Sequence, residues 1–246
     1  MDLRRLFIVG VSILFTSLAG TGFAQTANWT GPYIGAFGGY GSGTQGQHDT
    51  GIPCPAGDTG TPPNCVAPVI PTDGHYNLNG ALGGGLIGYN FAFDQFIIGA
   101  EGDIAGSGLA GYASNCGLPL AHVCGGDIYA MSDIRARVGL PFGQFMPFIA
   151  GGLAVGDIHA YDSLFGVSGT HWEAGWTIGG GIDYKIMTQL SLRLEYLYQD
   201  FARQTFFNIV PGVPERVRTD VNIVRAGIVW NFGAAPPPPA PLLAKY

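Results

Sequence analysis

Histidines near a serine and a carboxylate are the residues with which this chain could carry out hydrolytic chemistry. A serine hydrolase needs a histidine within hydrogen-bond reach of a serine and of a carboxylate. Ser163 and Asp162 stand close in sequence to His159 and His171. Short polar segments often contain these residue types by chance, so we predict no catalytic residue. The five histidines are His48, His75, His122, His159 and His171. A pair of these histidines could bind a metal ion, but no carboxylate or thiolate stands at a suitable ligand spacing, so no metal site is predicted.

A glycine-rich stretch raises the possibility of nucleotide binding. Gly83 to Gly88 match the G-x-G-x-x-G fingerprint, and Glu101 and Asp103 follow at a loosely suitable distance. That fingerprint requires a helix after its glycines, which presents a positive N-terminus to the pyrophosphate. Here the residues YNFAF and a tight turn follow instead. We therefore predict no cofactor and interpret these glycines as positions of bending or close packing in a strand.

The N-terminus has the features of an export signal. Arg4 and Arg5 precede an apolar run from Leu6 to Leu18, and small residues lead to Ala24. This pattern predicts a signal peptide over residues 1–24. The alternative, an N-terminal membrane anchor, is less favoured because the run is shorter than the ~20 residues of a spanning helix.

Export permits disulfide bonds between the four cysteines. Cys54 and Cys65 lie in one polar stretch, and Cys116 and Cys124 lie in another. Neither spacing resembles a zinc ribbon. Four cysteines allow three pairings, and the sequence favours the two local ones, Cys54 with Cys65 and Cys116 with Cys124.

The composition is not that of an ordinary soluble domain. Charged residues make up 11% of the chain, against about 25% in soluble domains. The net charge of -6 gives no electrostatic case for nucleic acid as a partner. After residue 24 no apolar run approaches the ~18 residues of a membrane helix. A chain that avoids charge without such helices indicates a transmembrane β-barrel, which also satisfies every backbone group in lipid.

Segments of period 2 recur through the chain and predict eight strands. The predicted strands cover residues 29–41, 76–91, 95–107, 127–140, 144–159, 171–185, 190–203 and 217–232. Tight connections alternate with long polar ones at residues 42–75, 108–126, 160–170 and 204–216. This rhythm is typical of an all-β, eight-stranded antiparallel up-and-down transmembrane β-barrel with long extracellular loops and both termini in the periplasm.

The stretch DIRARVGL shows how the predicted strands divide their faces. Ile134 and Val138 point to one side, whereas Arg135 and Arg137 point to the other. An arginine facing mid-bilayer lipid costs ~2–4 kcal/mol, so the charged face must turn into the lumen. The same parity predicts eleven lumen charges: Glu101, Asp103, Asp133, Arg135, Arg137, Glu173, Asp183, Lys185, Arg193, Glu195 and Arg225. They could line an ion path, but side chains nearly fill an eight-stranded barrel, which favours a plug of ion pairs.

Several blocks in a fixed order resemble a known family. They are NWTGPYIGAFGGYG, GGGLIGYNFAFDQFIIGAEGDIAGSG, DIRARVGLPFGQFMPFIAGGLAVGD, GWTIGGGIDYKIMTQLSLRLEYLYQDF and VRAGIVWNF. The chain resembles the small eight-stranded outer-membrane β-barrel proteins of Gram-negative bacteria, most of all the immunogenic surface-protein type of rhizobia and their relatives. The resemblance implies a location in the cell outer membrane, a role in envelope integrity and surface interactions, and no established catalytic residues. The long first loop with two cysteines and the proline tail depart from it.

The C-terminal residues offer two candidate ends to the barrel. Arg225, Gly227, Trp230 and Phe232 resemble the assembly signal of a terminal outer-membrane strand. Residues 25–233 are therefore the predicted barrel and residues 234–246 a Pro-rich periplasmic tail. Pro236 to Pro239 cannot donate ladder hydrogen bonds and predict a polyproline II stem. The tail could contact peptidoglycan or have no consequence.

These patterns predict a structural and surface-interaction protein of the bacterial envelope. Its expected partners are outer-membrane lipid, lipopolysaccharide and the barrel-assembly machinery. A narrow porin-like channel is the first alternative, and an outer-membrane lipid-modifying enzyme is the second. The sequence does not predict a loop ligand or an oligomeric state.

Overall fold

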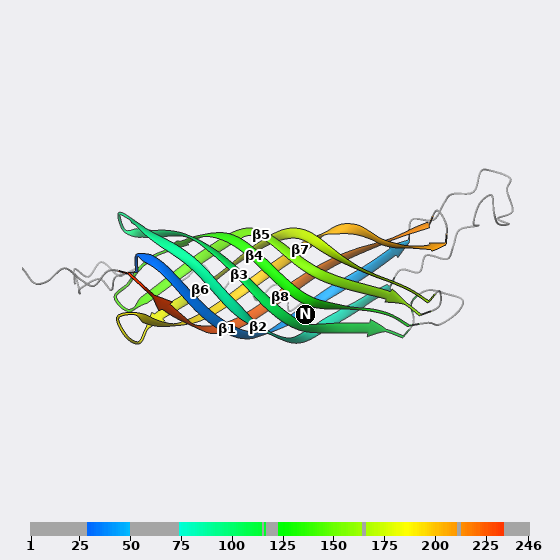
Figure 1. Cartoon of the computed structure of the whole chain (residues 1–246), viewed down its shortest axis with the longest axis horizontal. Coiled ribbons are helices and arrows are strands. Elements are labelled where there is room, and N and C mark those ends of the chain that lie inside the picture. The colour runs from blue at the N-terminus through cyan, green and yellow to red at the C-terminus, as the bar shows by residue number, and fades with distance from the viewer. Residues whose placement is uncertain are drawn as a thin grey trace, which may run out of the picture.

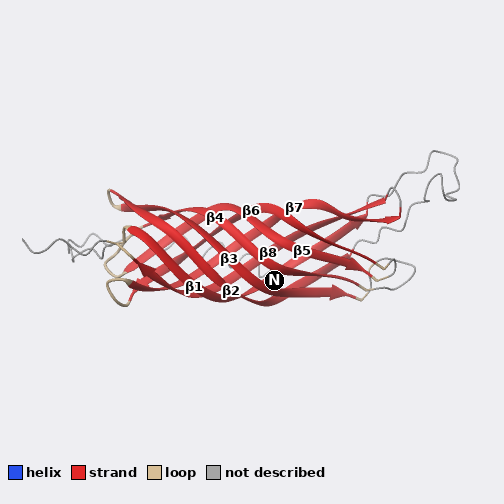
Figure 2. Ribbon diagram, in the orientation of Figure 1, coloured by secondary structure: helices blue, strands red, loops and turns tan. Residues whose placement is uncertain are grey.

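Eight antiparallel strands form a closed barrel in the computed structural model (Figure 1), which confirms the predicted fold class. The structure describes residues 29–49, 74–114, 116, 123–163, 166–210 and 213–233. Within these ranges the elements are strands joined by turns (Figure 2), and no helix is long and apolar enough to cross a membrane. The strands are β1 (Gly31–Asp49), β2 (Gly74–Phe93), β3 (Phe96–Ala113), β4 (Cys124–Gly139), β5 (Phe145–Asp162), β6 (Val167–Lys185), β7 (Leu190–Val210) and β8 (Val213–Asn231).

The barrel closes because its first strand pairs with both the second and the last. Ile34 on β1 is in register with Ile87 on β2 and with Trp230 on β8. Every strand therefore has two hydrogen-bonded neighbours, and no sheet edge is left open. The predicted signal peptide and the Pro-rich tail lie outside the described residues.

Tight turns join β2 to β3, β4 to β5 and β6 to β7, as predicted. Asp94 has a φ of 54° and Gly143 a φ of 60°, values that tight hairpin turns often require. Phe142 and Phe145 exchange backbone hydrogen bonds of 2.7 and 3.1 Å across the second turn. These three turns lie at one end of the barrel, here called the short-turn end. The opposite end is called the long-loop end.

Several strands extend further toward the long-loop end than we predicted. β1 continues to Asp49 rather than residue 41, β3 to Ala113 rather than 107, and β7 to Val210 rather than 203. Parts of the predicted long connections are therefore strand. The extension of β1 has the sequence SGTQGQHD, which lacks the apolar alternation that marks a strand. Its backbone still pairs with β2 and β8, so ladder hydrogen bonds maintain it where apolar packing is absent.

The two faces of the barrel wall follow the predicted alternation. On β4, Ile134 is 72% exposed on the outside, whereas the neighbouring Arg135 is 1% exposed inside. On β6, Trp172 and Trp176 are exposed and Glu173 is buried. The outer face thus carries large apolar side chains, as a lipid-facing surface requires.

A β-bulge shifts this alternation on β4. The pairing of β4 with β5 moves by one residue between Ile128 and Ala130. Ile128 and Met131 are consequently both buried, although they stand three residues apart. A bulge places one extra residue in one strand and so reverses the parity of the side chains beyond it. Parity alone therefore does not assign the faces of β4 beyond this point.

Candidate functional site: the barrel interior

All eleven predicted lumen charges are buried inside the barrel. Nine of them form one contiguous network in the half of the barrel nearer the short turns: Glu101, Asp103, Asp133, Arg135, Arg137, Asp183, Arg193, Glu195 and Arg225. The other two, Glu173 and Lys185, lie nearer the long-loop end and the short-turn end respectively. Five acids and four bases in the network come close to neutral charge, which reduces the cost of burying them.

Arg135 is the centre of the network. Its guanidinium lies 2.6 Å from Glu101, 2.9 Å from Asp103, 2.6 Å from Asp133 and 2.6 Å from Glu195. The planar guanidinium carries five donors in a fixed fork, which lets one side chain serve several carboxylates. A single residue therefore links β3, β4 and β7.

Arg137 and Arg193 share a second set of partners. Arg137 lies 2.9 Å from Asp183, and Arg193 donates from Nε to the same carboxylate at 2.7 Å. Both arginines also contact Glu101. The ring of Phe148 lies 4.0 Å from the Cζ atom of Arg137 and 5.0 Å from that of Arg193. Because the ring face attracts cations, Phe148 stabilises both groups where water is scarce.

Arg225 on the closing strand completes the network. It lies 2.7 Å from Asp103 and donates to Glu195 at 2.8 Å. Its Cζ atom is 4.2 Å from the centre of the Phe37 ring on β1. The network thus crosses the seam between the first and last strands, so the contacts that close the barrel are also contacts of the lumen charges.

Tyr33 is a member of the network that the sequence analysis missed. Its hydroxyl donates to Glu101 at 2.8 Å and accepts a hydrogen bond from Arg137 at 3.2 Å. The phenol ring occupies the space beside Gly88, its register partner, where a Cβ atom would come within 2.3 Å of the hydroxyl. β1 and β2 are so rich in glycine that no face could be assigned to Tyr33 from its neighbours.

An apolar layer separates the charged network from the long-loop end. Buried members of this layer include Leu78, Leu109, Ile128, Ile158, Leu197, Phe201, Val217 and Val221. Glu173 is buried at this level, opposite Gly156 in the register. The ring of Phe201 lies against Gly156. Neither carboxylate oxygen of Glu173 has a hydrogen-bond partner within the described part of the chain.

The short-turn end of the lumen is covered by a small cluster. Trp29, Ile97 and Met146 pack together there. The ammonium of Lys185 lies 4.6 Å from the centre of the Trp29 ring and donates to the carbonyl of Thr188 at 3.1 Å. Lys185 therefore stabilises this end of the barrel.

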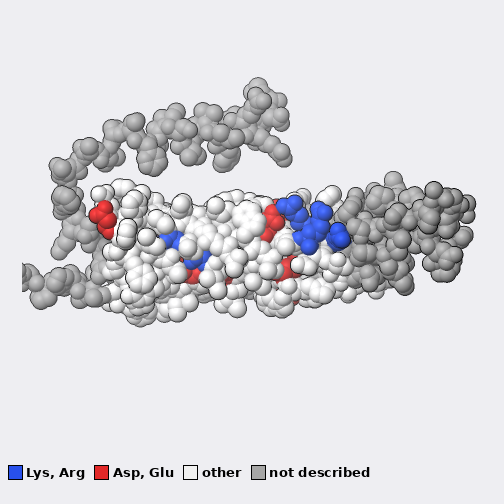
Figure 3. Space-filling model, turned by 90° about the horizontal axis from the view of Figure 1, so that it is seen from above, with Lys and Arg blue, Asp and Glu red and all other residues white. Residues whose placement is uncertain are grey.

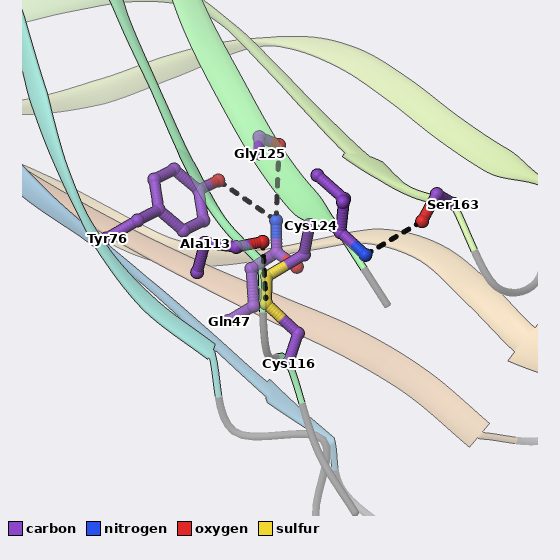
Figure 4. Close-up of a disulfide and its surroundings, with 8 residues drawn as sticks. Gln47, Tyr76, Ala113, Cys116, Cys124, Gly125 and Ser163 are labelled. Atoms are coloured by element: carbon purple, nitrogen blue, oxygen red, sulfur yellow. Dashed lines mark hydrogen bonds between the residues drawn. A yellow bond between two sulfur atoms is a disulfide. The ribbon is translucent and has the colours of Figure 1, made fainter. Parts of the chain in front are cut away.

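A disulfide joins Cys116 to Cys124 at the long-loop end (Figure 4). This pairing is one of the two predicted from the sequence. Beside it, Gln47 on β1 donates to the hydroxyl of Tyr76 at 3.0 Å and to the carbonyl of Gly125 at 3.4 Å. These contacts tie β1, β2 and β4 across the mouth of the barrel. The second predicted pair, Cys54 with Cys65, lies outside the described residues.

The candidate hydrolytic residues make other contacts. Nδ1 of His159 lies 3.3 Å from Asp127, and Nε2 of His171 lies 3.0 Å from the carbonyl oxygen of Phe206. The hydroxyl of Ser163 accepts a hydrogen bond from the backbone of Val123 at 2.9 Å. Residues 83–88, which match the nucleotide fingerprint, lie within β2 and precede a turn. His122 and the side chain of His48 lie outside the described part of the structure.

Comparison with known proteins agrees with this architecture. The outer membrane protein beta-barrel domain matches residues 11–232. The chain belongs to this family. It is 30% identical to the 31 kDa outer-membrane immunogenic protein of Brucella melitensis, over 85% of each chain. It is 27% identical to the 22 kDa outer membrane protein of Rhizobium leguminosarum, over 83% of this chain and 79% of that one. The protein is therefore a small outer-membrane β-barrel.

Solved structures of similar fold include two from other bacteria. The outer membrane protein OprG from Pseudomonas aeruginosa aligns with a TM-score of 0.47 and 14% identity, over 83% of this chain and 97% of that one. Neisserial surface protein A aligns with a TM-score of 0.39 and 12% identity, over 82% of this chain and 98% of that one.

Proposed function

We propose that this protein is a non-enzymatic structural barrel of the outer membrane, with a lumen plugged by its own side chains and with long loops that interact at the cell surface. The observation that carries the proposal is the contact of Arg135 on β4 with Glu195 on β7. These strands are not neighbours in the barrel, so the contact spans the interior. A pore through this level would have to break buried ion pairs.

The apolar layer gives the plug a second, independent barrier. A hydrated ion that passed the network would next meet Leu109, Ile158 and Leu197, all fully buried. Losing water in apolar surroundings is costly for any ion. Two barriers of different chemistry support a closed lumen better than either one alone.

The orientation follows from the two kinds of connection. Short turns face the periplasm in bacterial barrels, and the longer loops face outward. We therefore place the short-turn end, with its turns at Asp94 and Gly143, in the periplasm. The disulfide between Cys116 and Cys124 then stabilises a surface loop.

A narrow passive channel is the alternative. It is favoured by Glu173, a buried carboxylate for which the described residues provide no partner. An unpaired acid of this kind often marks a site that water reaches.

A solute-flux experiment separates the two functions. We expect liposomes that contain the refolded barrel to swell no faster in small sugars or amino acids than empty liposomes do. Swelling that rises with the amount of barrel would favour the channel. Labelling of intact cells tests the orientation: Ser163→Cys is expected to react with an impermeant maleimide from outside, and Thr188→Cys is not.

A further inference from the structure

The outer surface of the barrel carries one basic patch, at the long-loop end. Arg203 on β7 and Arg216 and Arg218 on β8 are exposed there. The other described lysine and arginine residues are buried. The largest group of basic atoms on the face shown in Figure 3 lies near this end, beyond a long, mostly uncharged surface. The exposed cations of the described residues therefore lie in one area.

The patch borders a groove of about 460 Å³. Its lining includes Thr44, Gly46, His75, Arg203, Arg218 and Asp220. Gly46 is in register with His75 on one side and with Arg218 on the other. Because glycine has no side chain and strands lie about 4.8 Å apart, roughly 10 Å separates the backbones of Arg218 and His75. The ring of His75 lies over Gly46, with its Nδ1 atom 2.9 Å from the position that a Cβ atom would take. The histidine and Arg218 thus flank the groove with two groups that can donate hydrogen bonds.

The two described acids near this groove already have partners. Asp200 lies 2.6 Å from Arg218, and Asp220 accepts a hydrogen bond from the hydroxyl of Thr44. Arg203 and Arg216, by contrast, have no ion pair or hydrogen bond with any other described residue. Among the described side chains, three arginines face two carboxylates, which leaves a positive charge and unused donors for an anion.

The groove lies just beyond the apolar band of the outer face. On the same strands, Leu192, Leu194, Val224 and Ile228 are exposed nearer the short-turn end. Aromatic residues mark the upper limit of this band. The ring of Tyr198 lies 5.4 Å from that of Trp176, and Tyr196 donates to Asn222 at 2.6 Å. Such aromatic residues lie at membrane interfaces. The polar rows beyond them, with Asp220 and then with Arg218 and Gly46, therefore lie at the level of the lipid headgroups.

We propose that this groove on β7, β8, β1 and β2 binds a phosphate group of the phosphorylated glycolipid in the outer leaflet. The proposal rests on the orientation given under Proposed function, which places the long-loop end at the outer leaflet. Arginine forms charge-assisted, often bidentate hydrogen bonds with phosphate oxygens. The acyl chains of the same molecule would lie along the exposed apolar side chains below the groove. The site thus fits one amphipathic ligand, whose phosphate lies in the groove and whose acyl chains lie along the apolar band.

Binding of fluorescent diphosphoryl lipid A to the full-length barrel, refolded in zwitterionic micelles, tests the proposal. We expect the triple variant Arg203→Gln, Arg216→Gln and Arg218→Gln to bind at least tenfold more weakly than the wild type. The matched variant with lysine at all three positions keeps the charge and is expected to lose less than threefold. Dephosphorylated lipid A is expected to bind wild type and triple glutamine variant alike, since it lacks the anion.

Equal binding of diphosphoryl lipid A by the wild type and the glutamine variant would overturn the proposal. So would equally tight binding of the dephosphorylated lipid by the wild type. The heat-modifiable band of the folded barrel confirms that each variant is folded. A micelle has no periplasmic or outer side, so the binding result does not depend on the orientation of the barrel. Labelling of intact cells tests the orientation separately, and the two proposals can therefore fail independently.

Discussion

The Nη1 atom of Arg135 on β4 lies 2.6 Å from Oε1 of Glu195 on β7. Three strand-to-strand steps separate β4 from β7 along the barrel wall, so this hydrogen bond crosses the lumen. Both side chains are buried. Their desolvation costs several kcal/mol per ion and is offset only while every partner stays in place. This arrangement makes the interior sensitive to the loss of any single charge.

Replacing Arg135 with alanine is expected to destabilise the barrel by about 3–5 kcal/mol, because four buried carboxylates lose a shared cation. The measurement is the urea midpoint of folding into lipid vesicles. Ile134→Ala on the same strand is the control, since Ile134 is 72% exposed and faces away from the network. A smaller loss for Arg135→Ala than for Ile134→Ala would contradict the role of Arg135.

Two buried glutamates are expected to respond in opposite ways to the same substitution. Glu101 contacts Arg135, Arg137 and Arg193, so Glu101→Gln should cost about 3 kcal/mol, given ~1.5–3 kcal/mol for each hydrogen bond to a charged group. Glu173→Gln should be neutral or stabilising, because it removes a carboxylate that has no described partner. The free energy of unfolding in vesicles compares the two. Equal losses would show that Glu173 is also paired.

Gly88 is expected to be required for the position of Tyr33. A Cβ atom there would come within 2.3 Å of the Tyr33 hydroxyl and 2.8 Å of the Ala100 carbonyl oxygen. Gly88→Ala should therefore cost about 1–3 kcal/mol, as overpacking usually does. Gly106→Ala is the matched control, since nothing lies within 4 Å of its Cβ position. If both alanine variants unfold at the same urea concentration, the packing of Tyr33 against Gly88 is not a constraint.

The closing strand is expected to contain the assembly signal. Trp230 and Phe232 are exposed on the outer face, and the backbone of Phe232 donates to Pro32 at 2.9 Å. Deleting residues 233–246 should leave assembly intact, whereas Phe232→Asp should lower it sharply, because an acid would face lipid. The heat-modifiable band in outer-membrane fractions reports assembly. A truncation that loses the band while Phe232→Asp keeps it would place the signal in the tail.

The lumen position of the charges and the lipid-facing side of the strands could be predicted, because a charged side chain that faces lipid is costly. Arg135 and Arg137 cannot face lipid cheaply, so parity on β4 assigns both at once. The same reasoning holds on β6 and β7, where Glu173, Arg193 and Glu195 stand between exposed apolar neighbours. The recurring segments of period 2 then predicted eight strands, and the alternation of short and long connections predicted the up-and-down order.

Other parts of the interior could not be predicted, for identifiable reasons. Tyr33 stands among glycines that have no side chain to show a face. The bulge between Ile128 and Ala130 reverses parity, so Ile128 could not be assigned to the interior. Leu197 and Phe201 share the parity of Glu195, and continuing that parity would have revealed part of the apolar layer. The register between Gly46, His75 and Arg218 depends on strand extensions without apolar alternation, which hid the outer groove.

Single-channel current across a planar bilayer tests the closed lumen most directly. We expect the wild-type barrel to give no steady conductance beyond small, flickering events, because the network of Arg135 and the layer of Leu109 and Leu197 both block the lumen. The folded state of the inserted protein is checked by its heat-modifiable band. A stable, large current from the wild-type protein would contradict the account and establish a channel in its place.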